Sequence, residues 1–75
     1  MEMWNLNRIP VQSSNLRSVG YDPNTRVLEI EFHSGGIYQY SGVSEFEYDA
    51  LMSASSKGSY FAHNIKNSHS VRKTR

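Results

Sequence analysis

The sequence predicts an α+β fold in which a three- to four-stranded antiparallel β-meander packs against one main helix and a short second helix. Two observations carry this prediction. Short stretches with period-two alternation, separated by turn residues, run from position 11 to position 40. From position 43 onward the apolar residues follow a helical spacing instead. With 75 residues, the chain is long enough for one domain with a small core.

The strongest strand pattern lies in residues 26–33, which place Leu28, Ile30 and Phe32 on one face and polar side chains on the other. One buried face and one solvated face are typical of an antiparallel sheet. The following Ser34-Gly35-Gly36 supplies the positive φ of a tight hairpin. Residues 37–40 then form the next predicted strand, with two tyrosines on one face.

The first strand is predicted over residues 11–21, with a bulge near Ser18-Val19 where the alternation breaks. The turn Asp22-Pro23-Asn24-Thr25 follows, because proline presets φ and the aspartate accepts a hydrogen bond from the turn. Residues 1–10 are expected to form a loosely ordered arm that can add a fourth edge strand.

The main helix is predicted over Ser44–Ala54, because Ser44 and Glu47 have the spacing of a capping box. Gly58 is expected to end this helix, and a short second helix spans residues 59–66. The domain therefore covers residues 11–66, and residues 67–75 form a basic flexible tail. The predicted core contains Leu16, Val19, Leu28, Ile30, Phe32, Tyr48, Leu51, Phe61 and Ile65.

Composition favours a cytoplasmic protein. The chain has no cysteine, no apolar run of membrane-spanning length, and no basic and apolar N-terminal segment of a signal peptide. The net charge of +1 conceals an asymmetry: residues 1–50 carry three arginines against seven acids, whereas residues 51–75 carry five basic side chains and no acid. A basic half of this kind either meets an anionic partner or only keeps the chain soluble.

No catalytic arrangement stands out, so we expect a protein that is not an enzyme and that uses no cofactor or metal. The three histidines lack metal-ligand spacing, and the serines lack a nucleophile elbow. The acidic side chains near the start of the main helix are explained by the capping box and the helix dipole.

Two groups of residues are candidates for binding. The cationic group would contact nucleic acid or another anion and consists of Lys57, Gly58, Ser59, Lys66, Arg72, Lys73 and Arg75. Within it, Lys57, Gly58 and Ser59 stand at the start of the second helix, where free N–H groups favour a phosphate or carboxylate. The aromatic group is Tyr38, Tyr40 and Tyr60, which either stack on unpaired bases or complete the core.

Taken together and in order, these residues resemble the KTSC domain, named for the C-terminus of some lysyl-tRNA synthetases and also found as small stand-alone bacterial and phage proteins. The resemblance covers residues 11–66 and rests on Ser13-Ser14, Val19-Gly20-Tyr21-Asp22, Leu28-x-Ile30-x-Phe32, Gly36-x-Tyr38-x-Tyr40, Val43, Ala54-x-Ser56-x-Gly58, Phe61 and Ile65-Lys66. Ser44 stands where many members have proline, and Ala62 where many have asparagine. The resemblance implies an α+β domain, and the synthetase context suggests RNA.

Two functions follow as hypotheses. The first is a non-catalytic nucleic-acid-binding module, for RNA rather than DNA, in which the cationic group contacts phosphates and Tyr38 or Tyr40 stacks. The second is a protein-interaction or regulatory module, phage-encoded and self-associating in one version, that uses the sheet face.

Overall fold

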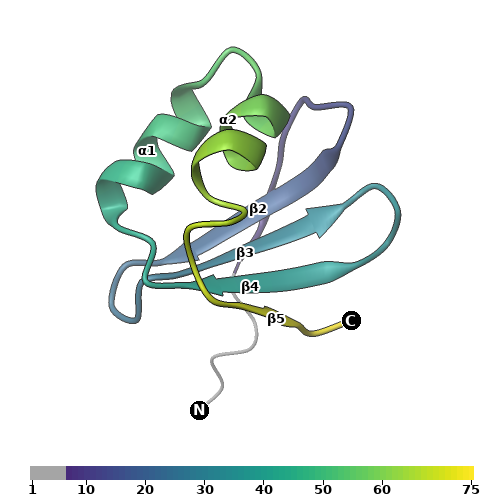
Figure 1. The fold of residues 1–75 in the computed structure, drawn as a ribbon. Coiled ribbons are helices and arrows are strands. Elements are labelled where there is room, and N and C mark those ends of the chain that lie inside the picture. The colour runs from purple at the N-terminus through teal and green to yellow at the C-terminus, as the bar shows by residue number, and fades with distance from the viewer. Residues whose placement is uncertain (1–6) are drawn as a thin grey trace.

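The computed structural model describes residues 7–75, which form one antiparallel sheet covered on one face by two helices (Figure 1). Helices α1 (Glu45–Ser53) and α2 (Lys57–Asn64) lie between the fourth and fifth strands in the chain. The strands lie in the sheet in chain order and are β1 (Ile9–Pro10), β2 (Leu16–Asp22), β3 (Val27–Phe32), β4 (Ile37–Ser41) and β5 (Val71–Lys73). The predicted α+β meander is confirmed, with one strand more than expected.

The turns follow the predicted chemistry. Gly35 has φ of +106°, and Phe32 N donates to Gly36 O over 2.9 Å, which closes the β3–β4 hairpin. Before β3, Asn24 N donates to Asp22 Oδ1 over 2.9 Å. The register of β2 against β3 shifts between Leu16 and Ser18, so the bulge lies just before its predicted position.

The core lies between the sheet and the two helices. Leu28 and Ile30 of β3 pack against Leu51 of α1 and against Phe61 and Ile65 at α2, all almost fully buried. Two members of the predicted core are only partly buried, namely Phe32 and Tyr48. Val43, which the sequence did not predict as a core residue, also takes part in the core, as does Tyr40, for which the sequence allowed either base stacking or a core position. Phe32 is the last residue of β3, so it lies at the edge of the core and the helices cover it only in part.

Both helices begin at serine caps. Ser44 Oγ accepts from Glu47 N over 3.1 Å and Ser44 N donates to Glu47 Oε1 over 2.9 Å, which confirms the capping box of α1. Ser56 caps α2 by accepting from Ser59 N over 3.3 Å, so α2 starts at Lys57, earlier than predicted. The prediction that Gly58 ends the first helix is wrong, because α1 already ends at Ser53 and Gly58 lies inside α2.

Both ends of the described chain contribute edge strands. Residues 67–75 were predicted as a tail but contain β5, which pairs with β4 through Tyr38↔Lys73 and Tyr40↔Val71. All three residues of β5 are exposed, and main-chain bonds hold the segment, including Thr74 N to Ile37 O at 2.8 Å. Side-chain patterning therefore carried no signal for this strand.

At the other end of the chain, β1 supplies the edge strand expected of the N-terminal arm. Residues 1–6 of the predicted arm lie outside the described residues. Within residues 7–75, neither helix is long and apolar enough to cross a membrane.

Candidate functional site

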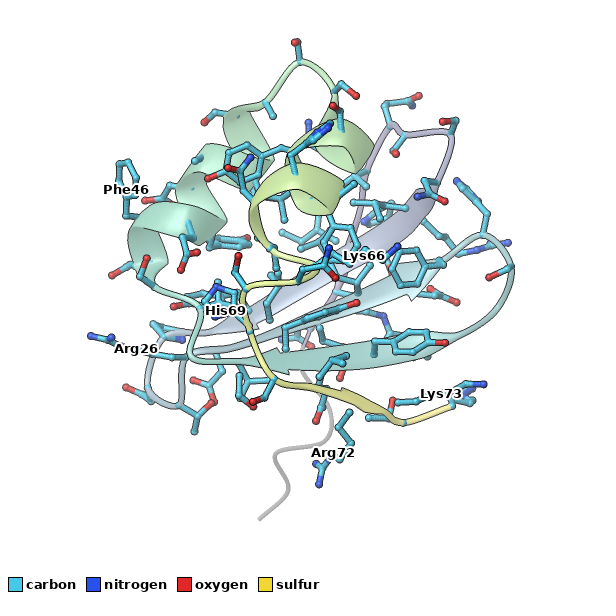
Figure 2. All side chains as sticks on the ribbon, viewed as in Figure 1. Arg26, Phe46, Lys66, His69, Arg72 and Lys73 are labelled. Atoms are coloured by element: carbon cyan, nitrogen blue, oxygen red, sulfur yellow. The ribbon has the colours of Figure 1, made fainter. Side chains whose placement is uncertain are left out.

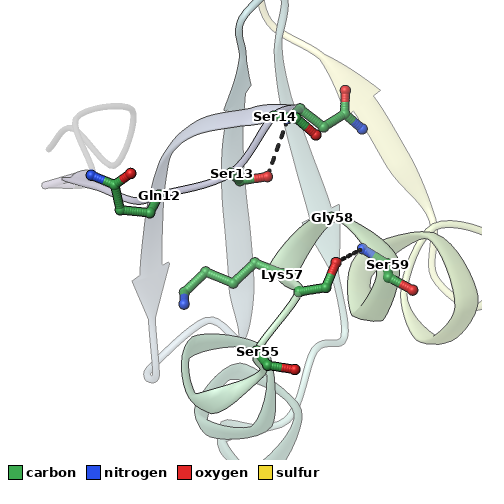
Figure 3. Close-up of a pocket in the computed structure, with 9 residues that line it drawn as sticks. Gln12, Ser13, Ser14, Ser55, Lys57, Gly58 and Ser59 are labelled. Atoms are coloured by element: carbon green, nitrogen blue, oxygen red, sulfur yellow. Dashed lines mark hydrogen bonds between the residues drawn. The ribbon is translucent and has the colours of Figure 1, made fainter.

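Two hollows adjoin α2, and each contains part of the predicted cationic group. The first, the serine pocket, lies at the start of α2 and has a volume of about 390 Å³ (Figure 3). Its lining is Gln12, Ser13, Ser14, Asn15, Ser55, Ser56, Lys57, Gly58 and Ser59. The structure thus brings Lys57, Gly58 and Ser59 together beside the loop that precedes β2.

Three polar side chains of the serine pocket already have structural roles. Ser13 Oγ accepts from the N–H groups of Asn15 and Leu16, at 3.1 and 3.2 Å. Ser56 Oγ is the cap of α2, and Lys57 Nζ donates to the carbonyl of Ala54 at 3.4 Å. Ser13 and Ser56 are therefore explained as a turn residue and a helix cap.

The second hollow, the aromatic groove, lies between the C-terminal half of α2 and the strands β3, β4 and β5. Its volume is about 470 Å³, within the range of about 300–1,000 Å³ that small-molecule sites occupy. Its lining is Asn15, Phe32, Ser34, Tyr38, Tyr40, Phe61, Ala62, Lys66, Asn67 and Val71. Aromatic rings, amide and hydroxyl groups and one lysine therefore share one surface.

Edge-to-face contacts hold the rings of the groove in place. Phe61 lies 5.2 Å from Tyr40 and 5.6 Å from Phe32, measured between ring centres. Phe32 in turn lies 5.5 Å from Tyr38. Such pairs are favourable beyond the area they bury. Because Phe32 and Tyr38 are only partly buried, the groove offers a fixed aromatic surface to solvent.

Two cations of the predicted group stand at the groove. Lys66 is exposed and lines it, and Lys73 Nζ lies 6.0 Å from the centre of the Tyr38 ring (Figure 2). Lys73 comes to this position because β5 pairs it with Tyr38. A distance near 6 Å from a ring centre is the outer range of a cation–π contact.

Apart from Lys57 in the serine pocket, the two remaining cations are placed differently. Arg72 points away from the groove, on the opposite face of the sheet, where its Nη2 donates to Gln39 Oε1 over 3.2 Å (Figure 2). Arg75 is exposed and follows β5, and its main-chain N–H donates to Ile37 O over 3.2 Å. The structure therefore places Lys57 at the serine pocket, Lys66 and Lys73 at the groove, and Arg72 on the far face.

The three candidate tyrosines have different surroundings. Tyr40 belongs to the core, with 5 % of its surface exposed, and also lines the groove. Tyr38 is partly buried beside it, and Tyr60 packs against the core outside the groove lining. Burial raises the pKa of Tyr40 above its ordinary value, and the neighbouring Tyr38 adds to the effect, so its hydroxyl stays protonated at neutral pH.

The face of the sheet away from the helices holds a polar network that the sequence did not reveal. Glu29, only 2 % exposed, accepts from Arg8 Nη1 at Oε2 and from Gln39 Nε2 at Oε1, the latter over 2.8 Å. Ser18 Oγ accepts from Arg8 Nε over 3.1 Å and donates to Glu31 Oε1 over 2.9 Å. Alternation placed the two glutamates on this face but could not show that Arg8 reaches them.

The histidines bond to separate partners. His33 Nε2 lies 2.9 Å from Ser13 O, and His63 Nδ1 lies 2.9 Å from Ser59 O. His69 Nε2 lies 2.9 Å from Glu47 Oε2, which ties the segment before β5 to the start of α1. Within residues 7–75, no three His, Asp or Glu side chains are grouped to hold a metal ion.

Comparison with known proteins identifies the fold. The family model of the KTSC domain matches residues 12–69, which is most of the chain. The chain belongs to the KTSC domain family. In this KTSC domain, the two rings of Tyr38-Gln39-Tyr40 both line the aromatic groove.

Two relatives of similar size support the assignment. The crystal structure of a KTSC domain protein from Yersinia pestis is similar, with a TM-score of 0.91 and 46 % identity, over 95 % of this chain and 100 % of that one. An uncharacterized protein from Stutzerimonas stutzeri is 44 % identical over 64 residues, which cover 85 % of this chain and 90 % of the relative. The KTSC domain described here is therefore like small proteins that consist of little else.

A third relative is much longer. A lysine–tRNA ligase from a Nostoc species is 40 % identical over 55 residues, which cover 73 % of this chain but only 10 % of the ligase. The similarity is thus confined to a short segment of that protein.

Proposed function

We propose that this KTSC domain is a small, non-catalytic module that binds single-stranded RNA in the aromatic groove. One observation carries the proposal: the groove places the partly exposed rings of Phe32 and Tyr38 beside Lys66 and Lys73. Aromatic faces for bases next to cations for phosphates are the combination that single-strand binders use. Each stacked base contributes about 1–3 kcal/mol in such sites.

The charge distribution supports an anionic ligand on this side of the molecule. Lys66 and Lys73 flank the rings, and in the described chain neither forms an ion pair with an acidic side chain. The far face is different, since Glu29 and Glu31 are already matched there by Arg8 and Arg17. An RNA strand is therefore expected on the helix side of the sheet.

The choice of RNA over DNA rests on the ligase from Nostoc, whose name gives tRNA as a substrate of the whole enzyme. Because the similar segment is a tenth of that enzyme, it is the recognition of RNA, not the ligation chemistry, that we carry over. An RNA-binding role also goes with a cytoplasmic location.

The test is fluorescence anisotropy of a labelled single-stranded RNA, titrated at two salt concentrations, with a DNA of the same sequence alongside. Lys66→Gln and Lys73→Gln should each weaken binding and each reduce the log–log salt slope by about 0.7. Arg17→Gln is the matched control, because it removes one exposed charge from the far face. RNA binding that is absent, or equally weakened by the control, would contradict the proposal.

The alternative is a protein-interaction module that self-associates. Light scattering during the same titrations tests it: a stable dimer that buries Tyr38 and fails to bind RNA would replace the RNA proposal with this one. A monomer that binds RNA would reject self-association.

A further inference from the structure

The hydroxyl of Tyr40 has no hydrogen-bond partner within the part of the chain that the structure describes. This is unusual for a tyrosine that is 5 % exposed, because the hydroxyls of buried tyrosines normally find a partner. Tyr21 shows the ordinary case, since its hydroxyl donates to Val43 O over 2.6 Å. Two tyrosines on the helix side of the sheet thus differ in whether the fold itself uses the hydroxyl.

The unpaired hydroxyl is reached by solvent, and Tyr40 is a residue of the groove lining. Among residues 7–75, no side-chain oxygen or nitrogen that is closed off from solvent lacks a partner. The Tyr40 hydroxyl, which lacks one, must therefore be reached by solvent, and the groove is the hollow that Tyr40 lines. A solvent-accessible polar atom on a residue that lines an aromatic groove is available to bond to whatever occupies the groove.

From this we infer that the aromatic groove contains a subsite for one nucleobase, in which the Tyr40 hydroxyl donates a hydrogen bond to an acceptor on the polar edge of the base. The base stacks on Tyr38, which lies two residues away on the same face of β4, about 7 Å along the strand. Lys66 at the rim receives the phosphate. The inference rests on the proposed function and assigns Tyr40 the role of selecting the base.

A hydrogen bond from the Tyr40 hydroxyl would both strengthen binding of a base and discriminate among the four bases. The aromatic surface of Tyr38 accepts any base, because every base has a π-face. A donor at a fixed point accepts only a base that presents an acceptor there, and a base without one leaves the hydroxyl unpaired and desolvated. The subsite should therefore bind the four bases with different affinities.

The experiment compares Tyr40→Phe with Tyr21→Phe, since each removes one hydroxyl and keeps the ring. The probes are the four nucleoside 5′-monophosphates, titrated by NMR, and the labelled single-stranded RNA. In Tyr40→Phe, affinity for the preferred monophosphate should fall about threefold to tenfold, and the preference among the four should flatten. Its thermal midpoint should be unchanged or higher, because no internal hydrogen bond is lost. Tyr21→Phe should show the opposite pattern, with a lower midpoint and unchanged affinity.

The outcomes separate this inference from the proposed function. If the unmodified protein binds RNA and Tyr40→Phe keeps both affinity and base preference, the role of Tyr40 is wrong and RNA binding stands. If monophosphates bind with the predicted loss in Tyr40→Phe but RNA does not bind, the subsite stands and the RNA function is wrong. If neither probe binds, both are overturned.

Discussion

Arg8 donates a hydrogen bond through Nη1 to Oε2 of Glu29 across the face of the sheet that the helices leave uncovered. The carboxylate is 2 % exposed, and Gln39 completes its hydrogen bonding. The side chain of Arg8 is 26 % exposed and also bonds to Ser18. One arginine beside a two-residue edge strand thus neutralises a carboxylate on a central strand of the sheet.

Removing only the arginine should destabilise the fold, because Glu29 would then be a buried charge without its cation. Arg8→Met should lower the free energy of unfolding by about 1–3 kcal/mol. The double variant Arg8→Met/Glu29→Gln should recover most of this loss, since a neutral amide needs no counter-charge and can still accept from Gln39. Urea denaturation measures both. Equal stabilities of the single and double variants would show that the charge of Glu29 is not what Arg8 stabilises.

Acid should weaken the attachment of α1 to the segment before β5. Burial acts to raise the pKa of Glu47, but the hydrogen bond from the Ser44 main chain and the contact with His69 outweigh it, so its pKa is lowered from the ordinary 4.5. A carboxylate with a lowered pKa in the folded state stabilises the fold above its unfolded pKa. That stability is lost as the pH falls through the folded pKa.

The free energy of unfolding should therefore decrease below about pH 4.5, and Glu47→Gln should reduce this decrease. Asp49→Asn removes an exposed acid from the same helix and serves as the control. Thermal unfolding followed between pH 3 and pH 7 gives the comparison. An acid dependence that Glu47→Gln leaves intact would mean that other carboxylates cause it.

The core should depend strongly on α1. Leu51 is fully buried, so Leu51→Ala should lower the free energy of unfolding by about 2–5 kcal/mol, which is a large share of a small domain's stability. Phe46 lies in the same helix but is 79 % exposed, so Phe46→Ala should change stability by no more than about 0.5 kcal/mol. Urea denaturation of both variants tests whether α1 packs on the sheet through Leu51. Similar effects of the two substitutions would contradict this packing.

Stacking should depend on Tyr38 more than on any other tyrosine. Tyr38→Ala should weaken binding of single-stranded RNA by about 1–3 kcal/mol, whereas Tyr60→Ala should affect stability rather than affinity. Tyr60 is the control because it packs against the core outside the groove. Affinities from anisotropy, normalised to the folded fraction of each variant, give the comparison. Loss of affinity in both variants alike would place the RNA elsewhere.

The parts of the fold that follow from local rules could be predicted from the sequence. The alternation of Leu28 and Ile30, the glycine turn at Gly35 and the capping box at Ser44 each depend on neighbouring residues alone. The start of α2 was misplaced because Gly58 is an equally good end for the previous helix, and only tertiary packing decides between the two. In the folded protein Gly58 packs against the loop that precedes β2, where a Cβ on residue 58 would lie 3.4 Å from Ser13 Oγ.

The candidate site was less predictable, because it depends on contacts between distant segments. The sequence pointed to Lys66, Lys73 and Tyr38 but could not show that β5 pairs Lys73 with Tyr38. Phe32 was expected in the core and instead forms one side of the groove, since it lies at the end of its strand. Arg72 has the same charge as Lys73 and is adjacent to it, yet strand alternation sends it to the other face.

The most direct test of RNA binding in the aromatic groove is an NMR titration of the ¹⁵N-labelled protein with a single-stranded RNA. If RNA binds in the groove, the amide shifts of Phe32, Tyr38, Lys66 and Val71 should change, while those of Ser18 and Glu29 on the far face should stay unchanged. Shift changes centred on the far face or on the serine pocket, or no changes at all, would contradict it.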